Sequence, residues 1–529
     1  MLVDDQIKIQ FSIRMHWIKL YIKAIMRRTI VYSVLAIYCL AGCSKLPANK
    51  NNFVLIQAGD SEETIIRKAA TLAPSPQQLR WQQLELTAFF HFGINTFTNK
   101  EWGTGKEDPQ LFNPTALDAD QWVRVAKESG FKQVILTAKH HDGFCLWPTA
   151  TTKHSIQSSP WKNGEGDVVK EVEEACRKYN IGFGVYLSPW DMNAPMYGSD
   201  AYNDFFVNQL TELLTRYGRI DEVWFDGANG EGPNGKKQVY DFERWYKLIR
   251  QLQPSATIAV MGPDVRWVGT ETGYGRETEW SVVPADNLDP ASIAAHSQTG
   301  IAFKPQGDMM GDDLGSRDKI KKAKGLVWYP AETDVSIRPG WFYHPEEDDK
   351  VKTPEKLFDI YFHSVGRNGV LLLNIPPDKR GLIHENDVKA LAELNKLITE
   401  TFDENLLKGA KIESPNGRKL NALLDQDSDT HFTTQKNDST TLITFSLPSI
   451  QLFDVLLLQE NIRHGQRVEK FVLEAEIDGE WKQVARGTTV GYKRLLRFDP
   501  VKAKNIRLRI ESSRLNPNIA EIGIYKLKD

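Results

Sequence analysis

Strand-like runs that alternate with amphipathic helices constrain the fold of this chain more than any other feature of its sequence. Between about residues 80 and 400, each short apolar run is followed by a segment with helical spacing of apolar and polar side chains. Alternating β and α elements indicate a parallel sheet with right-handed crossovers. The predicted strands are Leu86–Ile94, Gln133–His141, Ile181–Trp190, Glu222–Ala228, Thr257–Gly262, Gly325–Pro330 and Gly369–Ile375.

Helices are predicted between several of these strands. In the first, Val123, Ala126 and Lys127 follow helical periodicity, and Gly130 ends the helix. About seven or eight strands favour a closed barrel over an open sheet, so we predict an α/β fold with a TIM-like (β/α)8 barrel. The predicted helices are Leu117–Ser129, Val168–Tyr179, Ala201–Tyr217, Phe242–Leu252 and Glu355–Val365.

After Leu407 the helical pattern gives way to short alternating runs separated by turn residues, which predicts a C-terminal antiparallel β-sandwich. The predicted domains are a start with signal and tether at 1–52, a catalytic barrel at 53–405 and the sandwich at 406–529. The predicted strands of the sandwich are Thr441–Ser446, Val455–Leu458, Lys470–Ile477, Lys493–Phe498, Asn505–Glu511 and Glu521–Leu527.

The N-terminus has the pattern of an export signal. The basic residues Arg27 and Arg28, directly after Met26, precede an apolar run from Ile30 to Leu40. This run is too short for a membrane-spanning helix. Leu40-Ala41-Gly42-Cys43 resembles a bacterial lipobox. We therefore predict that Met26 is the initiator and that the protein is an exported bacterial lipoprotein of the periplasm or outer membrane, anchored through Cys43. The alternative is an ordinary signal peptide with a chance cysteine.

The composition of the chain indicates which classes of molecule it can bind. A net charge of −3 argues against a nucleic-acid partner, because nucleic acids are usually bound by a basic face. The 14 Trp residues favour sugar binding only weakly, since aromatic rings fill cores more often than sites. Cys145 and Cys176 fall in predicted core elements and are expected to be buried free thiols.

Polar and aromatic residues gather where four neighbouring predicted strands end. In a TIM barrel the active site lies at this end of the strands, and a barrel selected only for stability does not need such residues there. The four strand ends carry His91, then Lys139, His140, His141 and Asp142, then Tyr186 and Asp191, then Trp224 and Asp226.

Asp226 is the strongest single candidate, because it follows an apolar strand and precedes Gly227, where the backbone can turn away. A structural turn residue is the alternative. A glycosidase needs a second carboxyl group, about 5–5.5 Å away in retaining enzymes and about 6.5–9.5 Å away in inverting enzymes. Glu271 lies in a loop flanked by glycines, and Glu277 and Glu279 follow closely. The residues alone leave the choice among these three open.

The histidines also raise the possibility of a metal site. Adjacent side chains of a strand point to opposite faces, so His140 and His141 can enter one pocket only if the strand has just ended. The spaced His-x-His pair of many metal-dependent hydrolases is missing. Hydrogen bonds from histidine to sugar hydroxyls therefore fit better than metal ligation, and we predict that catalysis requires no cofactor.

These residues lie in motifs that closely resemble glycoside hydrolase family 29, the α-L-fucosidases. The resemblance spans about residues 80–400 and implies a barrel fold and double displacement with retention, with Asp226 as nucleophile. The matching stretches are His91–Phe97, Glu101–Gly103, Leu136–Phe144, Tyr186–Asp191 and Trp224–Ala228.

The resemblance also implies roles for further residues. Arg266–Gly273 resembles the subgroup specific for α-1,3/1,4-linked fucose and implies Glu271 as acid/base, although Thr270 and Thr272 replace the Asn and Ala of that pattern. Asp334–Trp341 resembles the same subgroup. Trp224, with Tyr186, is expected to pack the apolar face of the sugar. The positions that match fucose-binding residues of the family are His91, Glu101, Trp102, His140, His141 and Tyr186.

The C-terminal segment resembles discoidin-like, galactose-binding-like sandwiches. Its stretch Leu424–Thr430 is similar to their loop that can hold structural calcium through oxygen ligands, with a plain polar turn as the alternative. Sugar binding and a purely structural buttress both remain open for this domain.

The sequence thus predicts an exo-acting retaining α-L-fucosidase that acts on fucosylated oligosaccharides or glycans. Three alternatives remain: another retaining exo-glycosidase, a sugar-binding lipoprotein with an inactive barrel, and a metal-dependent hydrolase.

Overall fold

The computed structural model describes residues 52–285, 312–435 and 438–528. The predicted signal, tether and anchoring Cys43 lie outside the described residues. Across the described ranges, no helix combines the length and the apolar character that crossing a bilayer requires. Cys145 and Cys176 are buried free thiols, as predicted.

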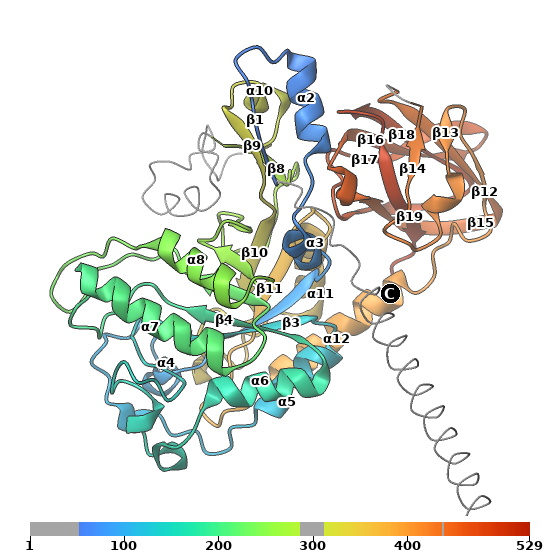
Figure 1. The fold of residues 1–529 in the computed structure, drawn as a ribbon. Helices are drawn as coiled ribbons and strands as arrows, with labels where there is room; N and C mark the ends of the chain where they lie inside the picture. Colours follow the sequence, from blue (N-terminus) through green and yellow to red (C-terminus); the bar gives the residue numbers. More distant parts are fainter. Residues whose placement is uncertain (1–51, 286–311, 436–437, 529) are drawn as a thin grey trace, which may run out of the picture. The chain divides into compact units, whose positions relative to one another are not determined.

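The catalytic part is an eight-stranded parallel barrel, which confirms the predicted fold class (Figure 1). The order of its strands is β6-β5-β4-β3-β2-β11-β10-β7, so only the seam between β6 and β7 lacks ladder hydrogen bonds. The strands are β2 (Leu86–Phe90), β3 (Gln133–Lys139), β4 (Gly182–Leu187), β5 (Glu222–Phe225), β6 (Thr257–Val260), β7 (Arg266–Trp267), β10 (Ala331–Ser336) and β11 (Val370–Asn374).

One predicted barrel strand is wrong. Gly325–Pro330 contains β9 (Gly325–Trp328), which pairs antiparallel with β1 (Phe53–Leu55) and β8 (Val282–Ala285) in a separate sheet. The barrel uses the next strand, β10, whose Glu332 and Asp334 make it look unlike a buried strand. A fully apolar run does not show which of two sheets will bury it.

Three of the helices that follow barrel strands begin at acidic caps. The side chains of Asp118, Asp167 and Asp241 each accept a hydrogen bond from a backbone N–H in the first turn of the following helix. Helices α5 and α6 pack together, as do α7 and α8 (Figure 1). The helices are α2 (Glu62–Thr71), α3 (Pro76–Gln82), α4 (Ile94–Thr98), α5 (Ala119–Glu128), α6 (Val168–Tyr179), α7 (Asp200–Arg216), α8 (Phe242–Leu252), α10 (Arg317–Ile320), α11 (Pro354–Ser364) and α12 (Glu385–Phe402).

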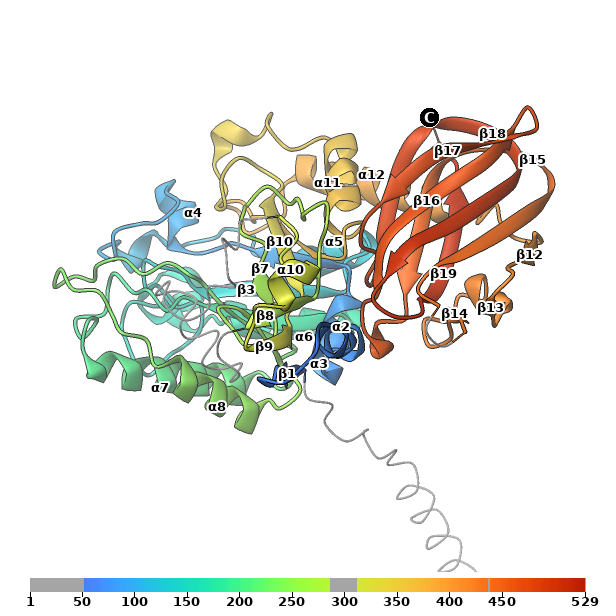
Figure 2. The same cartoon turned by 90° about the horizontal axis from the view of Figure 1, so that it is seen from above.

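The C-terminal domain is antiparallel throughout, as predicted (Figure 2). The predicted runs at 441–446 and 455–458 belong to one long strand, and so do those at 493–498 and 505–511, because register shifts let each strand continue through its irregular middle. The strands are β12 (Lys411–Glu413), β13 (Gly417–Arg418), β14 (Phe432–Thr434), β15 (Thr441–Glu460), β16 (Val468–Ile477), β17 (Glu480–Gly487), β18 (Arg494–Ser513) and β19 (Asn518–Tyr525).

Barrel and sandwich share an apolar interface. Val455, Leu457, Leu495 and Tyr525 of the sandwich belong to the same hydrophobic cluster as the barrel core. The sandwich also has a core of its own. Burial of these side chains opposes separation of the two domains, since apolar area removed from water contributes about 25 cal/mol per Å².

Two carboxyl groups lie inside the barrel wall. Glu222 accepts hydrogen bonds from Trp81 Nε1 (3.2 Å) and Gln133 Nε2 (2.5 Å), and Glu332 accepts one from Trp224 Nε1 (2.7 Å). Burial raises the pKa of Glu222 to about 8, and burial together with the neighbouring Glu222 raises the pKa of Glu332 well above its usual range. Burial thus favours the protonated form of both carboxyl groups.

We predict that the change of Tm with rising pH is more positive in Glu222→Gln than in the wild type. Because the folded-state pKa of Glu222 exceeds the ordinary 4.5, its contribution to stability is complete below about pH 4.5 and is lost as pH rises through about 8. Thermal unfolding between about pH 5 and pH 9 measures the slope. Glu480→Gln, on an exposed position of β17, is the control. Equal slopes for wild type and Glu222→Gln would contradict the prediction.

Candidate functional site

One cavity of about 180 Å³ opens at the carboxyl ends of the barrel strands. This is smaller than the roughly 300–1,000 Å³ of pockets for drug-sized ligands. All the predicted site residues except Tyr186 line it, and Tyr186 contacts it through Asp226. The lining residues are Phe89, His91, Glu101, Trp102, His140, His141, Trp224, Asp226, Ala228, Glu271, Asp334 and Trp341.

Asp226 follows the last residue of β5 and is held by two hydrogen bonds. Its Oδ2 accepts one from the Tyr186 hydroxyl (3.2 Å), and its Oδ1 accepts one from the Ala228 backbone N–H (2.6 Å). Burial, followed by the charge of Asp226, raises the pKa of Tyr186 well above its usual range, so the phenol keeps the proton that it donates. The carboxylate keeps about a quarter of its surface exposed, which leaves it accessible to a ligand.

His91 is a neutral ring with a defined tautomer. Asn374 donates from Nδ2 to the Trp341 carbonyl (2.7 Å), so its oxygen faces His91 Nδ1 (2.8 Å), and that nitrogen must donate. Burial lowers the pKa of His91 to about 3. His91 Nε2 therefore remains as a hydrogen-bond acceptor.

His141 is oriented in the same way. Ser188 donates its proton to the Trp190 carbonyl (2.7 Å) and therefore accepts from His141 Nδ1 (2.7 Å). Burial lowers the pKa of His141, although Asp226 Oδ2 lies 4.0 Å from its Nε2 and opposes the shift. Because β3 ends at Lys139, His140 and His141 both follow the strand, and both line the pocket.

Lys139 and Asp191, which also follow predicted strands, do not line the pocket. They form a buried ion pair (2.9 Å), and Gln209 accepts a further hydrogen bond from Lys139 Nζ (3.0 Å). Asp191 Oδ1 accepts from the backbone N–H groups of Asn193 and Ala194. This pair connects β3 to the loop after β4 and has a structural role.

Glu271 reaches the pocket from the loop that follows β7. Its Oε2 accepts a hydrogen bond from Trp341 Nε1 (3.2 Å). Gly273, with a φ of 77°, lies close behind it, and a Cβ there would approach Ile360 and Val335 to within 3 Å. Only glycine fits this position, so the loop can turn Glu271 toward the cavity while packing tightly against the barrel.

The two other candidates for the acid/base residue form ion pairs outside the cavity. Glu277 forms ion pairs with Arg367 (2.8 Å) and Arg494. Glu279 is buried between Arg266 and Arg276. Neither residue lines the cavity, so of the three candidates only Glu271 shares it with Asp226.

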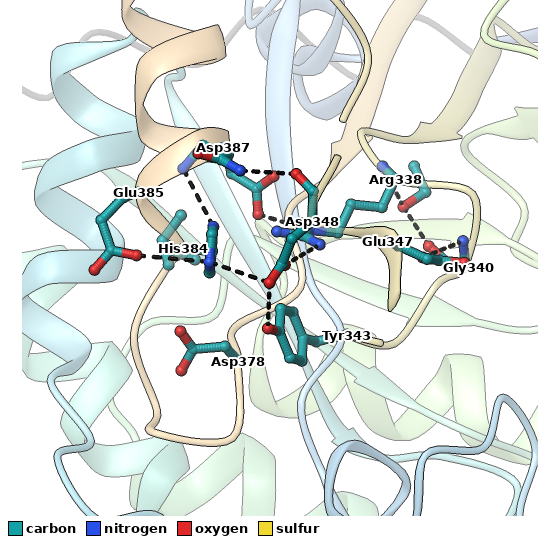
Figure 3. Close-up of polar contacts among 12 residues, drawn as sticks. Arg338, Gly340, Tyr343, Glu347, Asp348, Asp378, His384, Glu385 and Asp387 are labelled. Atoms are coloured by element: carbon teal, nitrogen blue, oxygen red, sulfur yellow. Dashed lines mark hydrogen bonds and ion pairs between the residues drawn. The ribbon is translucent and has the colours of Figure 1, made fainter. Parts of the chain in front are cut away.

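The loop after β10 contributes Trp341 to the pocket and depends on a buried arginine. Figure 3 shows this arginine, Arg338, with its polar partners. Arg338 is fully buried, with Nε bonded to Asp387 (2.9 Å) and Nη1 to Asp348 (2.9 Å). Tyr343 donates to the same Asp348 (3.1 Å). These contacts fix the turn that carries Trp341.

Glu101 binds this loop. Its carboxylate accepts hydrogen bonds from the backbone N–H groups of Trp341 (2.8 Å) and Phe342 (3.2 Å) and lies 2.6 Å from His344 Nε2. The predicted ligand-binding residue thus lines the cavity and also holds its wall. The contact could not be foreseen, because it joins residues about 240 positions apart.

Asp334 is a fourth carboxyl group in the cavity, beside Glu101, Asp226 and Glu271, and its position was not predicted. It is 5% exposed, and its Oδ1 accepts a hydrogen bond from Trp267 Nε1 (2.7 Å). Burial, with the charges of Glu271 and Asp226, raises the pKa of Asp334 to about 7. Its spacing of two residues from the interior-facing Glu332 is the sequence signal that could have found it.

Within the described residues, no group of three or more His, Cys, Asp or Glu side chains is placed to hold a metal ion. In the loop predicted to hold calcium, Asp425 and Asp427 accept hydrogen bonds from backbone N–H groups of the same loop, and Asp429 pairs with Arg463 (2.6 Å). Calcium binding by this loop stays a prediction.

Comparison with known proteins agrees with this geometry. The family model for alpha-L-fucosidase matches residues 72–401, and that for the F5/8 type C domain matches residues 408–523. Alpha-L-fucosidase 1 of Arabidopsis thaliana is 44% identical over 464 residues, which cover 85% of this chain and 87% of the plant protein.

Solved structures extend the similarity. A crystal structure from Bacteroides ovatus that is assigned as an α-L-fucosidase superposes with a TM-score of 0.80 and 55% identity, over 90% of this chain and 78% of that one. A Ruminococcus gnavus family 29 fucosidase in complex with fucose has a TM-score of 0.76 and 33% identity, over 86% and 95%. The chain therefore belongs to glycoside hydrolase family 29, the α-L-fucosidases, and is a glycoside hydrolase with a C-terminal F5/8 type C domain.

Proposed function

We propose that the protein is an exo-acting, retaining enzyme that releases terminal α-L-fucose, with α-1,3/1,4-linked fucose on oligosaccharides or glycans as its substrate class. The observation that carries the proposal is the single small cavity that Asp226 and Glu271 share. A pocket of this size at the end of a barrel suits one terminal sugar.

In the proposed mechanism, Asp226 is the nucleophile. Its ionised carboxylate attacks the anomeric carbon, the bond to the glycosidic oxygen breaks, and protonated Glu271 gives its proton to that oxygen. Glu271, now ionised, takes a proton from water, which attacks the anomeric carbon and releases Asp226. Two inversions give net retention.

The surrounding groups supply recognition. Neutral His91 and His141 present ring nitrogens for sugar hydroxyls, and His140 lies between them. Trp224 stacks on Tyr186, with ring centroids 5.2 Å apart, and can pack the apolar face of a deoxy sugar. The Glu332 carboxyl fixes the Trp224 ring from the barrel interior.

Two loops support the linkage proposal. The Glu271 loop and the Trp341 loop, which resemble the α-1,3/1,4-specific subgroup, meet at the Trp341–Glu271 hydrogen bond beside the cavity. That position is where the leaving group of a branched glycan would lie.

We predict that Asp226→Ala loses about 10³-fold or more in kcat, because covalent catalysis is removed. Azide should restore turnover and yield a fucosyl azide of inverted configuration, which NMR identifies. Asp204→Ala, at an exposed position of α7, is the matched control and should keep full activity. Normal turnover by Asp226→Ala would refute its role.

We predict that Glu271→Gln is crippled on natural glycans and much less affected on aryl fucosides with activated leaving groups, because the latter need little protonation. Steady-state kcat/KM on both substrates measures the difference, because it reports the first step, in which Glu271 donates its proton. If Glu277→Gln or Glu279→Gln shows a larger leaving-group dependence than Glu271→Gln, the proton donor is not Glu271.

Digestion of defined glycans tests linkage and stereochemistry. We expect release of fucose from Lewis-type α-1,3/1,4 linkages in preference to α-1,2 linkages, with the α-anomer formed first. NMR of the early product reports the anomer. The β-anomer as first product would exclude retention, and a preference for α-1,2-linked substrates would exclude the proposed linkage.

We also propose that the protein is exported and anchored to a bacterial membrane, either in the periplasm or at the outer membrane, through lipid on Cys43. The lipobox-like sequence supports this. Incorporation of labelled fatty acid into the wild type but not into Cys43→Ala, with the enzyme in the membrane fraction, is the expected result.

A further inference from the structure

The segment between β7 and β8 carries Glu271 and is bonded to the C-terminal sandwich along its second half. Gln466, which is fully buried, donates from Nε2 to the Glu279 carbonyl (2.9 Å) and accepts at Oε1 from the Ser281 N–H (2.8 Å). Thr489 accepts at Oγ1 from the Glu279 N–H (3.0 Å). The sandwich thus satisfies three backbone groups of this segment.

Charged contacts extend this attachment toward Glu271. Arg494, which is 1% exposed, donates to the Glu277 carbonyl (2.6 Å) and also pairs with the Glu277 carboxylate. Thr488 Oγ1 donates to the same carbonyl (2.9 Å). A buried arginine of this kind is costly to leave unpaired, so the backbone at Glu277 has little freedom to move away.

A second connection passes through helix α11. Asp359 of α11 accepts a hydrogen bond from the Tyr274 hydroxyl (2.6 Å) and pairs with Arg497 of the sandwich. Tyr274 follows Glu271 by three residues, and between them the Gly273 N–H donates to the Asp334 carbonyl (3.0 Å). The loop is therefore held at Gly273 and at Tyr274, directly after Glu271.

An ion pair joins the strand before this segment to the end of the segment. Arg266 of β7 pairs with Glu279, whose backbone the sandwich holds. Glu271 itself is exposed, and its carboxylate accepts the 3.2 Å hydrogen bond from Trp341. The position of its carboxyl group therefore depends mainly on the backbone of its loop.

We propose that the sandwich positions the proton donor: Gln466, Thr489 and Arg494 are positioning residues that act through the loop of Glu271. The inference rests on the proposed role of Glu271 as acid/base. General acid catalysis needs hydrogen-bond reach, and a misplacement of about 1 Å can cost as much as 10²-fold. Loosening the sandwich contacts should therefore slow reactions with poor leaving groups and spare those with activated ones.

The test compares the same substitution, threonine to valine, at two buried positions of the sandwich, and adds Gln466→Met. Thr489→Val removes the hydroxyl that holds the Glu279 N–H, and Gln466→Met removes two of the backbone contacts. Thr441→Val is the matched control, because Thr441 is also buried in the sandwich but bonds Asn416, far from the loop in the chain. For each purified full-length variant, kcat/KM is measured on a fucosylated glycan and on an activated aryl fucoside, together with Tm.

We expect Thr489→Val to lose about tenfold in kcat/KM on the glycan and less than twofold on the aryl fucoside, and Gln466→Met to lose more on the glycan. Thr441→Val should leave the ratio of the two rates unchanged at a similar Tm. Equal losses on both substrates, or no loss, in Thr489→Val would overturn the inference even if Gln466→Met fails to fold.

The variant Glu271→Gln distinguishes a failure of this inference from a failure of the proposed function. If Glu271→Gln shows strong leaving-group dependence and Thr489→Val shows none, the positioning role fails while the proposed mechanism stands. If Glu271→Gln itself lacks the dependence, the acid/base assignment fails, and with it the inference.

Discussion

The burial of Arg338 is the constraint on which the pocket wall depends. A guanidinium without solvent needs carboxylate partners, and loss of one partner of such a pair typically costs about 3–5 kcal/mol. Asp387 of α12 and Asp348 supply them and fix the turn after β10. That turn presents Trp341, whose backbone N–H binds Glu101 and whose indole N–H binds Glu271. A charge outside the cavity thereby fixes the residue that contacts two carboxylates inside it.

The pocket combines ionisable groups whose environments differ. Asp226 accepts hydrogen bonds from Tyr186 and from the Ala228 backbone and stays partly exposed. Asp334 is buried with a single indole donor, and its pKa is raised to about 7. The histidines are kept neutral by burial. The proposed mechanism likewise divides the roles between groups, since Asp226 attacks as a carboxylate while Glu271 carries the proton.

Local patterns were sufficient to predict much of this. The helix at 168–179 and the helix at 242–252 were predicted to the residue, because acidic caps and apolar periodicity coincide there. Asp226 was found because an apolar strand ends beside it. The strand β10 was missed, since Glu332 and Asp334 are buried by partners that the local sequence does not contain. The choice among Glu271, Glu277 and Glu279 depended on Arg494, 217 residues beyond Glu277.

The tautomers of the two oriented histidines restrict the chemistry of recognition. The ring N–H of His91 donates to Asn374, and the ring N–H of His141 donates to Ser188. The other ring nitrogen of each histidine carries only a lone pair. A sugar hydroxyl that bonds to this nitrogen must therefore donate its hydrogen to it. A ligand in which fluorine replaces that hydroxyl keeps a similar size but has no hydrogen to offer, and the site would reject it on polarity rather than on shape.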